Sequence, residues 1–132
     1  VRSRGLGDVY KRQQLPFVTP HGVFSRRKSD ALISASGLVV VDIDHLASLE
    51  EAEQLRDRLF ADPYLGTRLA FVSPGGLGVK LFIPGDETVR WAMSYIQLLY
   101  ADTFKGEVDT CGKDIARCCF LSHDSNAKIF IP

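Results

Sequence analysis

The sequence of 132 residues has no apolar run of 18 or more residues and only three cysteines. The first absence excludes a membrane-spanning helix. An odd number of cysteines, with Cys118 and Cys119 adjacent, argues against a disulfide framework and favours a reducing, cytoplasmic setting. Charge of one sign is not in excess either, because 16 basic residues balance 16 acidic ones. Any contact with nucleic acid must therefore come from a local patch rather than from bulk positive charge.

Residues 1–13 differ from the rest of the chain. They are predominantly basic, show no helical or strand periodicity, and contain neither an initiator methionine nor the apolar core of a signal peptide. The stretch is similar to the translated adapter remnants found at the ends of metagenomic reading frames, so we expect a non-native leader. Residues 14–132 then form one mildly acidic domain that is long enough to bury a core.

Hydrophobic periodicity beyond the leader predicts both strands and helices. Apolar and β-branched runs predict strands at residues 17–19, 23–24, 38–44, 68–73, 79–83, 117–121 and 128–131. A first helix follows a capping box at Ser48 and Glu51, with an expected inward stripe of Leu49, Ala52, Leu55, Leu59 and Phe60. A second helix is expected over residues 86–104, with Val89, Ala92, Met93, Ile96, Leu99 and Phe104 facing inward. This order predicts an α+β (α/β-like) fold: a mixed, mostly antiparallel sheet with two main helices packed on it.

Asp42 and Asp44 end the otherwise apolar strand Leu38–Asp44. Side chains alternate along a strand, so both acids project from one face while Ile43 enters the core on the other. At ~3.3 Å per residue the two carboxylates lie about 6–7 Å apart and can share divalent cations. Without a cation, desolvation and mutual repulsion destabilise such a pair. The alternative is that the strand simply ends here and both acids are solvated or cap the next helix.

A glycine-rich loop precedes Lys80 and joins two predicted strands into a hairpin. Glycines allow a backbone to approach a phosphate closely and to present its N–H groups, and a lysine adds a point charge. The loop leads into a strand rather than a helix, so it is not a P-loop. The candidate phosphate-binding residues are Ser73, Gly75, Gly76, Gly78 and Lys80. An ordinary hairpin turn remains the alternative.

A third carboxylate, Asp109, follows Val108, and Arg117 lies eight residues further on. Together they could complete a metal site and recognise phosphate, although the pattern has little weight alone. His45 is a further candidate beside Asp44 but points away if the strand continues, and His21 lies in a turn without an evident partner. Structural zinc is disfavoured, because the spacing is wrong among Cys111, Cys118, Cys119 and His123.

In this order, the motifs resemble those of the archaeo-eukaryotic primase (primase-polymerase) superfamily: an acid-x-acid pair on a strand, a hairpin with a basic residue, and an apolar-Asp motif before an Arg-bearing strand. More closely, residues 15–126 resemble the VirE amino-terminal-like domain, through LPFVTPHGVFSRRK, SGLVVVDIDHL, FVSPGGLGVKLFI and VDTCGKDIARCCFLSHD. That family is found at the front of mobile-element and phage-like replication proteins, often before a helicase-type ATPase. Lys80 stands where the wider superfamily has a histidine, and Gly78 where it has a serine. A lysine is usual in the VirE-like branch, but it cannot reproduce the hydrogen bonding of a neutral imidazole.

The resemblance implies two-metal nucleotidyl transfer on a nucleic-acid template or primer, within a fragment of a longer replication protein. Asp42, Asp44 and Asp109 would be catalytic and would hold two Mg²⁺ or Mn²⁺ ions. Lys80, the glycine loop and Arg117 would bind the incoming nucleoside triphosphate. Two alternatives stay open. One is a catalytically degenerate fold that binds nucleic acid or a helicase, and the other is a metal-dependent phosphohydrolase or nuclease.

Overall fold

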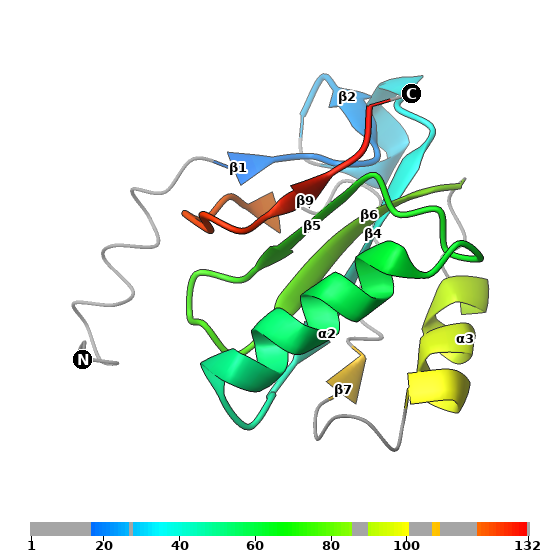
Figure 1. Ribbon diagram of the computed structural model, residues 1–132. Coiled ribbons are helices and arrows are strands. Elements are labelled where there is room, and N and C mark those ends of the chain that lie inside the picture. Colours follow the sequence, from blue (N-terminus) through cyan, green and yellow to red (C-terminus); the bar gives the residue numbers. More distant parts are fainter. Residues whose placement is uncertain (1–16, 27, 86–89, 101–106, 109–118, 132) are drawn as a thin grey trace.

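The computed structural model describes residues 17–26, 28–85, 90–100, 107–108 and 119–131 (Figure 1). Its helical elements are a 3₁₀ turn η1 (Ser29–Ala31), α2 (Leu49–Ala61) and α3 (Arg90–Tyr100). Its strands are β1 (Phe17–Val18), β2 (Gly22–Phe24), β3 (Leu32–Ala35), β4 (Leu38–Asp44), β5 (Leu69–Val72), β6 (Val79–Pro84), β7 (Glu107–Val108), β8 (Cys119–Phe120) and β9 (Lys128–Ile129). The α+β fold is therefore confirmed.

Five strands form the main sheet in the order β7-β4-β6-β5-β9. Two further pairs, β1 with β8 and β2 with β3, form small sheets of their own. All of these pairings are antiparallel. The predicted β5–β6 hairpin is confirmed, and β4 lies on the other side of β6 from β5.

Helix α2 begins at the predicted capping box. The Ser48 hydroxyl accepts a hydrogen bond from the Glu51 backbone N–H at 3.1 Å, and the Glu51 carboxylate accepts one from the N–H of Ala47 at 2.9 Å. These contacts satisfy N–H groups that a helix start leaves unpaired. One position of the expected stripe is wrong. Leu49 is 53% exposed, because it is the first helical residue and precedes the turn that packs on the sheet.

Helix α3 buries Ala92, Met93 and Ile96, as expected. Leu99 is 60% exposed and the prediction for it is wrong, because Tyr100 takes the buried position one turn after Ile96. Val89 and Phe104 lie outside the described residues. Within the described part of the chain, neither α2 nor α3 combines the length and apolar character needed to cross a membrane.

Each face of the main sheet carries its own apolar cluster. Helices α2 and α3 cover one face (Figure 1) and pack on alternate strand residues that include Val39, Val41, Ile43, Leu81 and Ile83. The opposite face carries a smaller cluster of Val40, Phe71, Phe82 and Cys119, with Val18 and Leu121 packed against it. Asp42 and Asp44 lie on this second face, beyond the small cluster.

Candidate functional site

The end of β4 places Asp42 and Asp44 on one face of the sheet. Ile43, between them, is fully buried in the helix-covered core. Because neighbouring strand residues point to opposite faces, the two acids share the other side. Asp42 is buried and Asp44 is half-buried. The three side chains thus have the predicted orientation, with both acids on one face of β4 and Ile43 on the other.

Lys80 lies directly opposite Asp42 in the β4–β6 pairing. Its Nζ atom is 2.8 Å from Asp42 Oδ1, and the two side chains are 16% and 7% exposed. Strand β6 is flanked by β4 and β5, so Lys80 is not an exposed lysine at the sheet edge. Lys80 lies on the same face as Asp42, as predicted, and forms an ion pair with it.

The loop between β5 and β6 closes against the end of β4. The N–H of Ser73 donates to the Gly78 carbonyl oxygen, and the N–H of Leu46 donates to that of Leu77, both at 2.9 Å. Gly76, with φ +81°, occupies the left-handed region that favours glycine. The predicted phosphate-binding loop and the two acids therefore meet at one end of the sheet.

Gly78 lies where the glycine loop comes closest to the end of β4. A Cβ atom there would lie 2.8 Å from Ser73 Oγ, 2.9 Å from the Ile43 carbonyl oxygen and 3.3 Å from Asp44 Oδ1. The absent side chain lets Gly78 approach oxygen atoms from two parts of the chain, Ser73 in the loop and the end of β4 at Ile43 and Asp44. Carboxylate, hydroxyl and carbonyl oxygens are the donors that Mg²⁺ and Mn²⁺ prefer.

Strand β7 lies on the outer side of β4. Val108 pairs with Ile43 and Glu107 with Asp44. Asp109, which follows Val108 in the sequence, and Arg117 lie outside the described residues. The third predicted carboxylate thus follows a strand that borders the strand of the other two.

Two carboxylates do not make a complete metal site. Among the residues that the structure describes, no three His, Cys, Asp or Glu side chains are grouped to hold a metal ion. The carboxylates of Asp42 and Asp44 and the nearby hydroxyl of Ser73 nevertheless offer oxygen donors that fit a hard divalent cation with a further ligand. Asp109 is the predicted source of that ligand.

His45 adopts a left-handed backbone conformation, with φ +63°, and its side chain is exposed. Strand β4 therefore ends at Asp44, and the condition under which His45 would point away from the acids does not hold. It is the one residue other than glycine with positive φ in the described segments.

The model of the family described as "BT4734-like, N-terminal domain" matches residues 10–128. The chain belongs to this family. The match spans all the candidate site residues, from Asp42 to Arg117. Comparisons with curated proteins and with solved structures find no match. The family's printed name differs from that of the VirE-like domain, so the resemblance to primase-polymerases remains a prediction.

Sequence reasoning about this BT4734-like domain missed a buried ion pair. Arg56 of α2 donates to both carboxylate oxygens of Asp124, at 2.9 and 3.0 Å, and their side chains are 3% and 7% exposed. Asp124 also accepts from the backbone N–H of Val72, at 2.9 Å. Burial opposes ionisation of Asp124, but the N–H groups of Val72 and Asn126 and the guanidinium of Arg56 outweigh it and lower its pKa. The pair ties α2 and the end of β5 to the segment after β8.

His21 is a second residue whose role was missed. It is 6% exposed, and its Nε2 atom lies 3.5 Å from the backbone N–H of Val40. The imidazole thus reaches β4 two residues before Asp42. Gly22, the next residue and the first of β2, lies so close to β3 that a Cβ there would clash with the Ser34 carbonyl oxygen.

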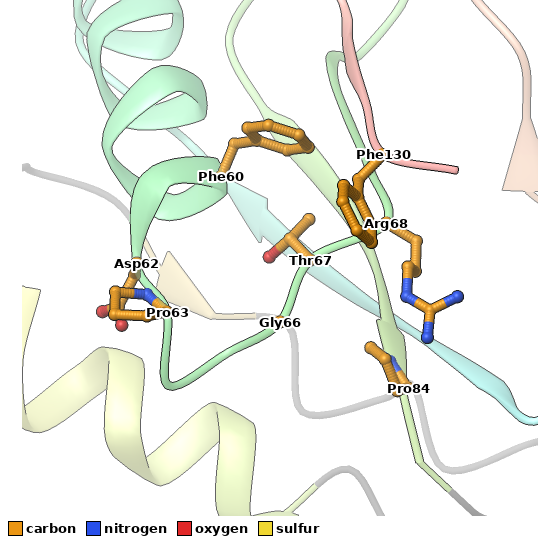
Figure 2. A pocket seen from close by; sticks show the side chains of 8 residues that line it. All are labelled: Phe60, Asp62, Pro63, Gly66, Thr67, Arg68, Pro84 and Phe130. Carbon is orange, nitrogen blue, oxygen red and sulfur yellow. The ribbon is translucent and has the colours of Figure 1, made fainter. Parts of the chain in front are cut away.

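A separate apolar hollow of about 380 Å³ lies at the other end of the β5–β6 hairpin (Figure 2). Its lining residues are Phe60, Asp62, Pro63, Gly66, Thr67, Arg68, Pro84 and Phe130. The Arg68 guanidinium is 5.9 Å from the centre of the Phe130 ring. Asp62 is the only carboxylate in this lining, so the hollow does not offer the paired acids of the site at the end of β4.

Proposed function

We propose that this BT4734-like domain is a primase-polymerase-type nucleotidyltransferase that uses nucleoside triphosphates with Mg²⁺ or Mn²⁺ on a nucleic-acid template. The observation that carries the proposal is the convergence of Asp42, Asp44, Lys80 and the glycine loop at one end of the sheet. The order of motifs that resembles the primase-polymerase superfamily supports it.

The energetics of the convergence support a functional reading. A carboxylate as buried as Asp42 destabilises a fold unless a cation offsets its charge. Such clusters of charge in partly buried positions are common at functional sites, where charge is needed for chemistry. Apolar residues in place of both Asp42 and Lys80 would extend the Val40–Phe82 cluster without that cost.

Each residue has a role in this proposal. Asp42, Asp44 and Asp109 would hold the divalent ions, which when bound supply Lewis acidity for the attacking 3′-hydroxyl and the leaving pyrophosphate. Lys80, Arg117 and the backbone N–H groups of the loop would bind the phosphates. Because the carboxylates outnumber the ammonium groups here, a bare triphosphate would be repelled and a metal-chelated one accepted.

The proposal extends to partners only through the resemblance. A template or primer strand would contact the domain, a helicase-type ATPase would follow it in a longer replication protein, and both would act in the cytoplasm. The alternatives of a degenerate fold and of a phosphohydrolase or nuclease use the same residues.

The degenerate alternative has one specific observation in its favour. The ammonium of Lys80 sits 2.8 Å from Asp42, so the chain itself provides a cation for that acid. A domain without metal chemistry could keep its fold through this ion pair and serve as a nucleic-acid or helicase-binding module.

Extension of a labelled primer on a template, with Mg²⁺ or Mn²⁺, separates these functions. We expect the wild-type chain to incorporate nucleotides and Asp44→Asn to do so about a hundredfold less or worse, because Lewis-acid stabilisation is worth several kcal/mol. Asp30→Asn, at an exposed acid of the 3₁₀ turn η1, is the matched control and should retain full activity. Primer shortening would favour a nuclease, and binding of nucleic acid with neither reaction would favour the degenerate fold.

A further inference from the structure

We propose that Lys80 is an exchangeable counter-ion, which Asp42 gives up for a divalent cation when Lys80 turns to a bound triphosphate. Metal and triphosphate would then bind as a coupled pair and each would bind weakly alone. The inference rests on the proposed function, because it concerns the same site. It adds a way in which the site is kept unreactive until both ligands are present.

The ion pair is enforced by the sheet. Asp42 and Lys80 are directly opposed residues of β4 and β6, and Phe71 of β5 opposes Lys80 on its other side. Val40 and Phe82, next along the same face, are buried in an apolar cluster. In these surroundings the ammonium and the carboxylate attract each other strongly, and neither is stable alone.

A divalent cation must compete with this arrangement. At 2.8 Å the Lys80 ammonium occupies one of the acceptor positions of Asp42 Oδ1, and its positive charge repels a second cation nearby. When both Asp42 and Asp44 hold the metal, a displaced Lys80 would be left beside Phe71 and Phe82 without an anion. Binding of metal alone is therefore opposed.

A triphosphate removes that opposition. Gly78 lies on the same face two residues before Lys80, and the loop that it ends is the predicted phosphate site. Lys80 has a long, flexible stem with three donors, so it can turn from Asp42 towards a phosphate in the loop. Asp42 can then act as a metal ligand. By linkage, the metal raises the affinity for the triphosphate by the same factor as the triphosphate raises the affinity for the metal.

Titration of Mn²⁺ into the full chain, with and without a non-hydrolysable nucleoside triphosphate, tests the exchange. Free Mn²⁺ is measured by its paramagnetic resonance signal, which does not depend on activity, and chelation of Mn²⁺ by the triphosphate itself is measured without protein and subtracted. The wild-type chain should bind Mn²⁺ about tenfold more tightly when the triphosphate is present. Lys80→Met should bind Mn²⁺ alone about tenfold more tightly than wild type and lose most of the enhancement by triphosphate, whereas Lys80→Arg should keep it.

Lys28→Met, at an exposed residue just before η1, is the matched control and should behave as wild type. Thermal melting supplies a second test, which remains valid if Lys80→Met is less stable than wild type. Mn²⁺ alone should restore the melting temperature of Lys80→Met and should change that of Lys80→Arg very little. If wild type and Lys80→Met bound Mn²⁺ equally well and showed equal enhancement by triphosphate, the exchange would be wrong and the proposed function would remain intact. Absence of Mn²⁺ binding by both chains, even with triphosphate, would overturn the exchange and the proposed function together.

Discussion

At the scale of single residues, Gly78 shows how a missing side chain shapes the candidate site. Its absent Cβ would lie 2.9 Å from the backbone carbonyl oxygen of Ile43, a residue of β4 that is held between β6 and β7. We expect Gly78→Ala to reduce the free energy of unfolding by about 1–3 kcal/mol, as overpacking of a fixed structure does. It should also weaken Mn²⁺ binding, because the added methyl group would displace the Asp44 carboxylate. Urea denaturation and Mn²⁺ titration measure the two effects.

Gly85→Ala is the matched control for this substitution. Its Cβ would meet only the side chain of Val39, at 3.4 Å, which is an ordinary contact. The variant should unfold within about 0.5 kcal/mol of wild type, as a well-tolerated substitution does. If Gly78→Ala were as stable as Gly85→Ala and bound Mn²⁺ equally well, the close approach of the loop to β4 would be wrong.

Residue-scale prediction from the sequence succeeded where the governing pattern is local. Alternation along β4 determines which face of the sheet Asp42, Ile43 and Asp44 each occupy. The same rule places Lys80 on the other face of β6 from Val79 and Leu81. The ion pair of Arg56 was not predicted, because its partner Asp124 is 68 positions away in the chain. Only its place on the apolar side of α2 gave a hint, since a charge at such a position needs a partner.

At the scale of elements, Asp62 joins the end of α2 to α3. Its Oδ2 accepts hydrogen bonds from the hydroxyls of Tyr95, at 2.8 Å, and Tyr100, at 2.7 Å, while Oδ1 accepts from the N–H of Tyr64 at 2.9 Å. Burial opposes ionisation of Asp62, but these hydrogen bonds outweigh it and hold its pKa below the ordinary value. The pKa of Tyr100 is raised, mainly by burial and further by the hydrogen bond and negative charge of Asp62.

The lowered pKa of Asp62 predicts acid sensitivity. A carboxylate whose pKa is lower in the folded chain stabilises it above the ordinary pKa of about 3.9, and that contribution is lost as pH falls through the folded value. We expect the free energy of unfolding to decline below about pH 4. Asp62→Asn should lower it at pH 7 by about 2 kcal/mol, through weaker hydrogen bonds from the two phenols, and should reduce the loss at acid pH.

Urea denaturation from pH 3 to pH 7 measures this effect. Part of the acid dependence should survive in Asp62→Asn, because the pKa of Asp124 is lowered too. Asp30→Asn, at an exposed residue, should keep the wild-type profile. An Asp62→Asn profile identical to that of wild type would show that the link between α2 and α3 contributes nothing to stability.

Elements were predictable to different degrees. The capping box fixed the start of α2 because its signal lies within four residues, and the β5–β6 hairpin followed from its glycine loop. The strand order β7-β4-β6-β5-β9 could not be read from the chain, because it depends on pairings between distant segments. Leu49 and Leu99 were assigned inward by spacing alone, whereas tertiary packing buries one side of each helix more narrowly.

At the scale of the whole molecule, the main sheet separates two regions of different chemistry. The paired acids, Lys80 and the glycine loop lie where β4 ends and β6 begins, while the apolar hollow in Figure 2 lies where β6 ends at Pro84. Helices α2 and α3 stiffen the sheet from one face and leave the acids on the other. This arrangement suits a site whose ligands come from adjacent strands of one rigid sheet.

The most direct test of the central claim is the position of Mn²⁺ in crystals of the chain grown with Mn²⁺ and a non-hydrolysable nucleoside triphosphate. Anomalous scattering identifies the metal without reference to activity. We predict a Mn²⁺ ion about 2.1 Å from carboxylate oxygens of both Asp42 and Asp44, with Lys80 turned to a phosphate. Manganese found only elsewhere, for example beside Glu50, Glu53 and Asp57 in the acidic hollow next to α2, with Asp42 still paired to Lys80, would contradict the account.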